Sequence, residues 1–256
     1  MVEGKIHAVN SPNTQTYCLT MRRTLLLGAT VAVLSLSLSA AGSSPKDDIT
    51  SAAKALADKA NYSWRMTTVV PEDSRFRPGP WDGKIEKDGL THVTLSFGEN
   101  TSQFVVKGDK GAATTQDGGW QSLSEMEGGE GMGRFFGMMI RNFKAPAAQA
   151  TQLASYAKEL KKEGELYSSD LTEEGAKVLL TWRPQAGGDG PKVSGAQGSV
   201  KFWLKDGALT KYEFKLKGKV SFNENEWDND RTTTVEIKDV GATKLNVPEE
   251  AKKKLS

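Results

Sequence analysis

The segment 210–222 alternates between apolar and charged residues along most of its length. Its even-numbered positions include Tyr212, Phe214, Leu216, Val220 and Phe222. Its odd-numbered positions include Lys211, Glu213, Lys215, Lys217 and Lys219. Successive side chains of a β-strand point to opposite faces, so this period of two predicts a long antiparallel strand with one buried and one wet face. The chain must therefore build a sheet that buries one side of this strand.

The same alternation recurs earlier in the chain, at 62–70 and 90–97. Between such runs stand Asp-Gly pairs at 88–89, 117–118 and 206–207, which tolerate the positive φ of tight hairpin turns. Strands that follow one another in the sequence are therefore expected to pair as a meander. The acidic run 223–230 lacks the glycine and the distal glutamate of an EF-hand loop, so we expect a solvated hairpin tip there.

Helical spacing and helix-end signals predict short helices beside these strands. In 47–60, acidic residues stand at the front and apolar residues recur at roughly helical spacing. Further helices are expected at 126–143, at 150–162 with Gly164 closing the end, from Asp170 or Thr172 onward, and in a terminal turn after Pro248. The run VLLTW at 178–182 fits a helix or a strand equally. The glycine-rich stretch 186–198 is expected to be a flexible loop before a strand at 199–204.

Residues 21–41 have the features of a secretory signal peptide. Met21-Arg22-Arg23 precedes an apolar run at 25–38 and small residues at 39–41. That apolar run is short for a membrane span, which needs about 20 residues. We therefore expect a mature single domain at 42–256, located in the periplasm or secreted, with no transmembrane segment after cleavage. Both Sec and twin-arginine export fit this signal, and residues 1–20 are an upstream extension without structural meaning.

Charge and cysteine content exclude several classes of function. Removing residues 1–41 takes away three basic residues and one acidic residue, so the totals fall from 34 and 32 to 31 and 31. The lysines alternate with acids along the strands, so nucleic acid is not expected as a partner. The single cysteine, Cys18, precedes the signal. The mature chain therefore has no disulfide, no cysteine nucleophile and no lipidated N-terminus.

Catalytic and metal-binding residues are sparse after the signal. His92 is the only histidine there, on the polar face of a predicted strand, and one histidine without cysteine does not assemble a zinc site. A serine triad that uses His92 remains open, although the sequence contains no G-x-S-x-G elbow. We expect a protein that is not an enzyme and that uses no cofactor or metal, with a hydrolase using His92 as the least favoured alternative.

The most unusual segment is 128–143, in which methionine and phenylalanine crowd between glycines. Methionine is unbranched and polarizable, so Met-rich surfaces adapt to apolar partners of varied shape. This segment either forms a mobile lid over an apolar cavity or fills the core beneath the sheet. Its candidate ligand-binding residues are Met132, Phe135, Phe136, Met138, Met139 and Phe143. Four residues of the predicted strands would line the same cavity or pack as core, namely Trp64, Trp203, Tyr212 and Phe214.

The order of the elements resembles the LolA, LolB and LppX superfamily of bacterial envelope proteins. The likeness covers most of 47–254 and includes the turn DGGW at 117–120, the segment LKDGALTKY at 204–212 and the ending VPEEA at 247–251. The resemblance implies an incomplete antiparallel β-barrel wrapped around helices, with a hydrophobic cavity. It also implies a role in carrying lipoproteins or lipids, or in holding lipids near a membrane. One departure is that the outer-membrane acceptor type is itself lipidated, which this chain cannot be.

These observations predict an α+β fold, a curved antiparallel β-sheet that forms an open, incomplete barrel with helices packed on its concave side. The expected function is binding or carrying an apolar ligand, a lipid or a lipoprotein acyl chain, with hydrophobic burial as the main source of affinity. The alternative is a non-catalytic envelope interaction protein whose barrel is filled by its own side chains and whose loops contact a partner protein. A measured cavity would separate these two.

Overall fold

A computed structural model describes residues 43–255, apart from 75–76, 99, 116, 130–131, 182–189 and 223–224. The predicted signal peptide at 21–41 and the extension 1–20 lie outside the described residues. The described part is one compact unit with its own core.

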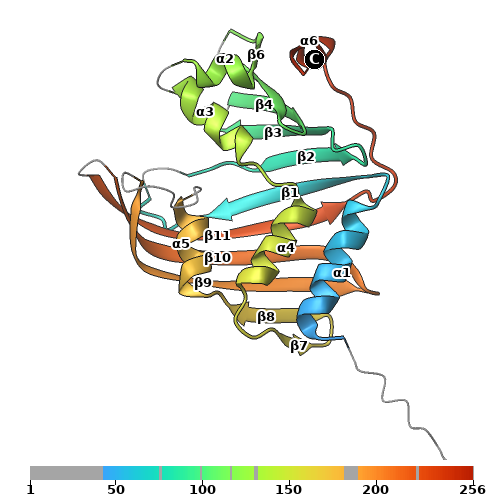
Figure 1. Ribbon diagram of the computed structural model, residues 1–256, viewed down its shortest axis with the longest axis vertical. Coiled ribbons are helices and arrows are strands. Elements are labelled where there is room, and N and C mark those ends of the chain that lie inside the picture. The colour runs from blue at the N-terminus through green and yellow to red at the C-terminus, as the bar shows by residue number, and fades with distance from the viewer. Residues whose placement is uncertain are drawn as a thin grey trace, which may run out of the picture. The chain divides into compact units, whose positions relative to one another are not determined.

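A single antiparallel sheet of eleven strands forms the frame (Figure 1). Its order is β6-β5-β4-β3-β2-β1-β11-β10-β9-β8-β7, which amounts to two meanders joined by the pairing of β1 with β11. The strands are β1 (Asn61–Val69), β2 (Trp81–Glu86), β3 (Thr91–Phe97), β4 (Asn100–Lys107), β5 (Lys110–Thr114), β6 (Trp120–Ser122), β7 (Lys161–Glu163), β8 (Leu166–Asp170), β9 (Lys192–Lys205), β10 (Ala208–Phe222) and β11 (Asn225–Lys238). The predicted meander pairing is therefore confirmed.

Two groups of helices cover the concave face of this sheet. The helices are α1 (Pro45–Ala57), α2 (Leu123–Glu127), α3 (Met132–Arg141), α4 (Pro146–Tyr156), α5 (Glu173–Thr181) and α6 (Glu249–Lys254). In Figure 1, α1, α4 and α5 lie over the half of the sheet that contains β8–β11, and α2 and α3 lie over β4–β6. The curved sheet is open and carries α1 to α5 on its concave side, so the predicted α+β class is confirmed.

The first helix begins where the sequence supplies the groups that a helix start requires. Ser44 accepts from the backbone N–H of Asp47, and the Asp47 side chain accepts from Ser44 in return, which makes a capping box after Pro45 at the first position. Its apolar stripe is buried against α4 and the sheet, and comprises Ile49, Ala52, Ala53 and Leu56. This amphipathic pattern fixes which side of α1 faces the core.

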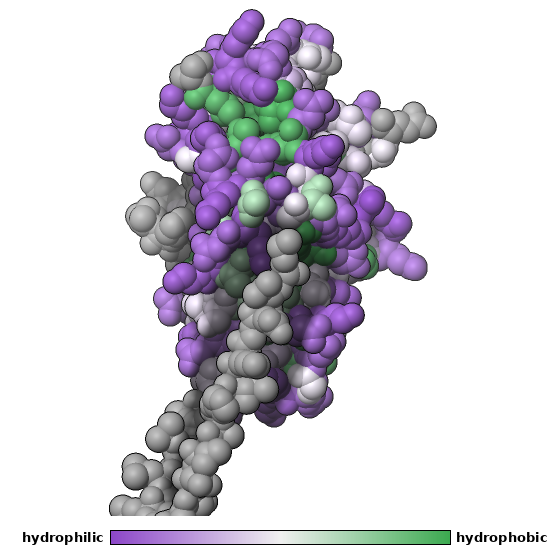
Figure 2. All heavy atoms as spheres, turned by 90° about the vertical axis from the view of Figure 1, so that its right-hand side faces the viewer, coloured by the Kyte–Doolittle hydropathy of each residue, from purple (hydrophilic) through white to green (hydrophobic). Residues whose placement is uncertain are grey.

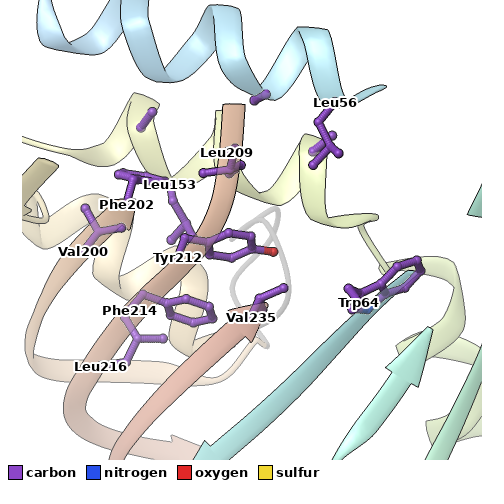
Figure 3. Close-up of a cluster of buried hydrophobic side chains, with 14 of the residues drawn as sticks. Leu56, Trp64, Leu153, Val200, Phe202, Leu209, Tyr212, Phe214, Leu216 and Val235 are labelled. Atoms are coloured by element: carbon purple, nitrogen blue, oxygen red, sulfur yellow. The ribbon is translucent and has the colours of Figure 1, made fainter. Parts of the chain in front are cut away.

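The long strand β10 follows the predicted alternation. Tyr212, Phe214 and Leu216 are buried on the concave face, where Figure 3 shows them beside Val200, Phe202 and Val235 of the neighbouring strands. The lysines point outward and pair with acids, as in Lys219–Glu226 at 2.9 Å and Lys215–Asp230 at 3.6 Å. Exposed ion pairs of this kind contribute little each, so the buried face supplies most of the stability.

Asp206 and Gly207 form the β9–β10 turn with φ values of 51° and 76°. Positive φ at both central positions is the geometry of the tight hairpin turn that Asp-Gly favours. Gly89 and Gly118 have positive φ as well, and they stand between β2 and β3 and between β5 and β6. The three predicted turns are thus confirmed.

Several predicted boundaries were wrong because tertiary pairing overrode local pattern. The helix predicted at 150–162 is α4, which begins at Pro146 and ends at Tyr156, since Lys161–Glu163 pair with β8. Gly164, predicted to close that helix, instead makes the β7–β8 turn with a φ of 64°. The helix predicted at 126–143 is divided into α2 and α3.

The part of the predicted loop 186–198 that the structure describes is mostly strand. Residues 192–198 belong to β9 and pair with β10 across a register shift near Gly195, whose φ is 60°. A glycine at positive φ allows such a bulge without ending the strand. Residues 225–230, predicted as part of a hairpin tip, likewise belong to β11. Residues 178–181 of the ambiguous run VLLTW are helical, within α5.

The C-terminal segment covers the opposite, convex face of the sheet. Val247 and Ala251 pack on Val105 of β4 and Ala112 of β5, which point away from α2 and α3. Lys254 donates to both carboxylate oxygens of Glu125 at 2.9 and 3.0 Å. The helix α6, predicted from the proline, acids and lysines at 248–254, therefore departs from the expected concave side. In the described part of the chain, no helix is both long and apolar enough to cross a bilayer.

Gly83 of β2 pairs with Trp64 of β1, and the Trp64 indole lies over it. A Cβ at Gly83 would stand 2.0 Å from Cζ2 of that ring. We expect Gly83→Ala to push the ring aside and lower the free energy of unfolding by about 2 kcal/mol in urea titrations.

The matched control is Gly133→Ala in α3, where a Cβ would meet open space. It is expected to be neutral or stabilising by up to about 1 kcal/mol, because alanine favours a helix. If both variants lose the same free energy of unfolding, the packing of Trp64 does not depend on the absence of a side chain at Gly83.

Candidate functional site

Five aromatic side chains form a seam on the concave face, between the two groups of helices. We call Tyr62, Trp64, Trp81, Phe104 and Phe143 the aromatic seam. Phe143 lies edge-on to Phe104 with ring centroids 5.2 Å apart, and it stacks on Trp64 at 6.3 Å and 21°. Trp81 meets Phe104 edge-on at 6.3 Å, and Tyr62 is tilted against Trp64 at 5.9 Å. Such pairs add about 0.5–1.5 kcal/mol each beyond the area that they bury.

Phe143 holds a special position because it comes from the link between the helix groups. It follows α3 and precedes α4, in a stretch without regular structure at 143–145. Its ring reaches β4 through Phe104 and β1 through Trp64. Phe143 is only partly buried, whereas Trp64 and Phe104 are 3% and 1% exposed. A single side chain of a short link thus closes the seam.

The other candidates of the Met/Phe segment divide between the core and its border. Met139 is 8% exposed and belongs to the core, while Phe136 and Met138 are partly buried. The side chains of Met132 and Phe135 lie outside what the structure describes. Both predicted roles, core filling and ligand contact, therefore remain available to different residues of this segment.

The helices α2 and α3 pack closely as a pair. Arg141 at the end of α3 binds both carboxylate oxygens of Glu127 on α2. Gly137 lets the helices approach, since a Cβ there would stand 3.3 Å from side-chain atoms of Met126 and Glu127. Beneath them, a Cβ at Gly111 of β5 would lie 3.1 Å from Cγ2 of Ile140. These contacts hold α2 and α3 against each other and against β5.

The candidate aromatic residues of the strands lie on both faces of the sheet. Trp64, Tyr212 and Phe214 are buried on the concave face. Trp203 points to the convex face, where Lys211 lies 4.5 Å from its ring centroid. Its neighbour Phe202 takes the buried position, so Trp203 cannot share a concave cavity with the other three.

Two tyrosine hydroxyl groups introduce polarity into this apolar core. The Tyr212 hydroxyl donates to Oε1 of Gln149 on α4 at 2.6 Å. The Tyr62 side chain is 2% exposed, and its hydroxyl has no hydrogen-bond partner of full geometry among the described residues. Burial raises the pKa of Tyr62 to about 12, an effect that the nearby Ala147 backbone at the start of α4 opposes. Burial also raises the pKa of Tyr212.

The sequence reasoning had not proposed Tyr62, Trp81, Phe104 or Gln149 for the site. The alternation at 62–70 puts Tyr62 on the same strand face as Trp64, so strand parity is the signal that could have found it. Trp81 and Phe104 come from strands whose mutual register the sequence does not determine.

The concave apolar stripe of β10 continues beyond the helices to the β10–β11 hairpin. Val220 is 2% exposed, whereas Phe222 is 39% and its near neighbour Trp227 of β11 is 45% exposed. Trp227 pairs with Val220, so both lie on the concave side of the sheet. The apolar side chains of β10 therefore continue from the core to an exposed pair of aromatic side chains. The facing positions of β11 are polar, with Arg231 beside Leu216 and Asn229 beside Gly218.

An open groove of about 430 Å³ lies at the other end, between α1 and the turns at Gly164 and Gly207. Asp48 sits in its wall and accepts from the Tyr167 hydroxyl at 2.7 Å and from Lys162 at 3.1 Å. Hydrogen bonds from Ser43, Tyr167 and Lys162 lower the pKa of Asp48 from 3.8 to about 2. The wall of this open groove combines charged residues with apolar ones such as Ala52 and Leu204. It contains none of the candidate ligand-binding residues, so it is not the cavity that the sequence predicted.

Catalytic and metal chemistry find little support in the described residues. Nε2 of His92 lies 2.9 Å from Oε1 of Gln103 on the neighbouring strand. An amide at that place does not supply the acid of a serine triad. Among the described residues, no group of three or more His, Cys, Asp or Glu side chains could hold a metal ion.

The face seen in Figure 2 is mostly hydrophilic, with one clear exception. Apolar residues gather there in the upper half, at the height where Figure 1 places β2–β6, α2, α3 and α6. The partly buried Leu90, Leu245 and Leu255 belong to this half of the structure, around the contact of the C-terminal segment with β4 and β5.

Comparison with solved structures gives three likenesses that cover most of this chain. Lipoprotein LppX of Mycobacterium tuberculosis is 15% identical, with 79% of this chain and 97% of LppX covered and a TM-score of 0.46. LprF of Mycobacterium bovis is 11% identical over 80% of this chain and 96% of its own, with a TM-score of 0.41. A LolA superfamily protein of Nitrosomonas europaea is 10% identical, with 77% of this chain and 93% of its own chain covered and a TM-score of 0.32. These include the families that the sequence resembles, while the fold class rests on the chain's own sheet order.

No protein-family model matches the sequence, and a search of characterised proteins finds no significant match.

Asp48 provides a test of the α1 end. Because its pKa is lowered, the carboxylate stabilises the fold above pH 4, and this contribution is lost as the pH falls through about 2. We expect Asp48→Asn to lower stability by about 1 kcal/mol at pH 7, and the difference from wild type to vanish between pH 4 and pH 2. Thermal unfolding across this pH range measures it.

Glu159→Gln, at an exposed position, serves as the control and is expected to change the melting temperature little. A deficit of Asp48→Asn that stays constant down to pH 2 would refute the assigned role of the carboxylate.

Proposed function

We propose that the chain is an exported envelope protein that binds or carries an apolar ligand, a lipid or a lipoprotein acyl chain, between the concave face and its helices. The observation that supports this most directly is the closure of the aromatic seam by Phe143. The ring of a short link fills the space between Trp64 and Phe104, where an acyl chain would find apolar walls on both sides. A ligand that displaces Phe143 would gain the contacts that this ring now makes.

The mobile part in this proposal is the pair α2 and α3. Arg141 and Glu127 keep the two helices together, and the stretch at 143–145 joins them to α4. Rotation about that stretch would withdraw Phe143 from the seam without disturbing α1, α4 or α5. The cost is the loss of the Phe143 contacts and of packing such as Ile140 against Gly111, which burial of an acyl chain offsets at about 0.8 kcal/mol per CH₂ group.

The concave stripe of β10 suggests the route by which a ligand arrives. Val220, Phe222 and Trp227 extend the apolar face past the helices to the β10–β11 hairpin. An acyl chain that meets the exposed aromatic pair would follow the apolar side chains of β10 toward the core, beside the polar residues Asn229 and Arg231 of β11. Export to the periplasm, proposed from residues 21–41, would place this surface near bacterial membranes.

The second candidate function is a non-catalytic envelope interaction protein with a filled interior. A specific observation favours it, since one continuous core contains the fully buried residues Leu153, Phe202, Tyr212 and Leu216. In that case Phe143 is ordinary core, and the exposed surfaces contact a partner protein. The two candidates differ in whether the seam opens.

Native mass spectrometry distinguishes them. The chain is expressed with its own N-terminal residues, purified from the periplasm and recorded with and without added phospholipid. We expect lipid-sized adducts on the wild type, a larger bound fraction for Phe143→Ala because the competing ring is gone, and a smaller one for Met138→Asp because a charge at the cover disfavours acyl chains.

Val240→Asp is the matched control for Met138→Asp, because Val240 is 44% exposed and far from the cover in the sequence. It is expected to bind lipid as the wild type does. The carrier function would be excluded if the wild type and a folded Phe143→Ala both carry no adduct and take up no added lipid. This outcome would favour the interaction protein with a filled interior. Unfolding of Met138→Asp would assign Met138 to the core.

A further inference from the structure

The start of α4 lacks the polar side chain that usually satisfies a helix N-terminus. Ala145 is the N-cap residue and Pro146 follows, and no side chain hydrogen-bonds to the first turn. Ala147 is 5% exposed at the second helical position, where a backbone N–H has no partner within its own helix. A buried donor is therefore directed toward whatever lies before α4.

The Tyr62 hydroxyl lies at that point. Its oxygen is close to the Ala147 backbone, but short of a full hydrogen bond. No described residue accepts its proton, although the side chain is 2% exposed. A buried hydroxyl without a partner is unfavourable, so such groups usually meet water or a ligand. Two donors thus converge on one place inside an apolar core.

Apolar rings adjoin this place. Tyr62 contacts Trp64, and Trp64 contacts Phe143, which leaves the seam in the proposed open state. A ligand that fits must combine an acyl chain for the seam with a hydrogen-bond acceptor for the two donors. The first and last turns of α4 contain no acidic or basic residue, and an ionised carboxylate is costly to bury without a cation. A neutral carbonyl oxygen fits better.

We propose that Tyr62 and the start of α4 bind the ester carbonyl of an acyl chain held in the aromatic seam. The proposal rests on the function proposed above and specifies its ligand as an acyl ester. The Tyr62 O–H and the Ala147 N–H donate to the carbonyl oxygen, while the hydrocarbon lies between Trp64 and Phe104. Esters of this kind occur in glycerolipids and in the diacylglyceryl group of lipoproteins.

Tyr212 offers a matched comparison. Its hydroxyl is buried nearby but already donates to Gln149 at 2.6 Å. Tyr212→Phe leaves the partly buried Gln149 acceptor without its donor and is expected to lower the melting temperature. Tyr62→Phe removes a hydroxyl that has no partner in the ligand-free protein, so its melting temperature is expected to be unchanged or higher.

The test measures the affinity of the full chain, purified from the periplasm, for methyl palmitate, for palmitate and for n-hexadecane. Wild type is expected to bind methyl palmitate more tightly than either of the other two. Tyr62→Phe is expected to reduce the ratio of methyl palmitate affinity to hexadecane affinity about tenfold, the effect of one hydrogen bond to a carbonyl. Tyr212→Phe is expected to keep the wild-type ratio.

A wild type that binds hexadecane and methyl palmitate equally, with a ratio unaffected by Tyr62→Phe, would overturn the ester site and leave the proposed carrier function intact. Tightest binding of palmitate would also overturn the ester site. So would a Tyr62→Phe variant that keeps the preference for the ester but is destabilised like Tyr212→Phe, because the hydroxyl would then bind only a buried water. Failure of all three probes to bind would instead contradict the proposed function itself. A diacylglycerol and a synthetic diacylated lipopeptide, compared in the same assay, then distinguish the two sources of the ester.

Discussion

The contact of Phe143 with Trp64 and Phe104 joins two halves of this molecule that are otherwise covered separately. One half packs α1, α4 and α5 on β8–β11, and the other packs α2 and α3 on β4–β6. The sheet itself is continuous across β1 and β2, so the two halves share one sheet but are covered by separate groups of helices. Whether the two groups of helices separate depends on the link at 143–145, which places the ring of Phe143 between them.

This arrangement explains why a filled core and a binding function are compatible. In the proposed open state, the half with α1, α4 and α5 would keep buried residues such as Leu153. The other half would lose packing such as Ile140 against Gly111. In that state, the seam would exchange contacts between protein side chains for contacts with the ligand. Its Tyr62 hydroxyl is the one place in it where the closed state leaves a polar group unsatisfied among the described residues, which lowers the free-energy difference between the closed and the liganded forms.

Much of the fold could be predicted because strand parity and turn chemistry are local properties. The alternation of 210–222 placed Tyr212 and Phe214 on the buried face, and Asp206-Gly207 marked its hairpin. Trp203 shows the limit, since KFWLK presents three successive apolar residues and only the register of β9 with β10 decides that Phe202 faces inward. Lys161–Glu163 became a strand because β8 pairs with it, which no local pattern encodes.

The candidate site was harder to predict than the fold for the same reason. Phe143 stood out as part of a Met/Phe segment. Its neighbour Phe104, and Trp81 that contacts Phe104, lie about 40 and 60 residues before it along the chain and join the seam only through the sheet order. The sequence could not show that the Tyr62 hydroxyl lacks a hydrogen-bond partner, because its surroundings depend on where α4 begins. Long-range register, rather than residue type, therefore determines the chemistry of this seam.

Double electron–electron resonance across the seam tests most directly whether the two halves separate. Arg134 of α3 and Ser155 of α4 are exposed and accept spin labels in a Cys18→Ser background, and Lys54 with Ser155 gives a reference pair within one half. Opening of the seam predicts that added acyl ester shifts the Arg134–Ser155 distance distribution to longer values and leaves Lys54–Ser155 unchanged. An Arg134–Ser155 distribution that is identical with and without saturating ligand would contradict it.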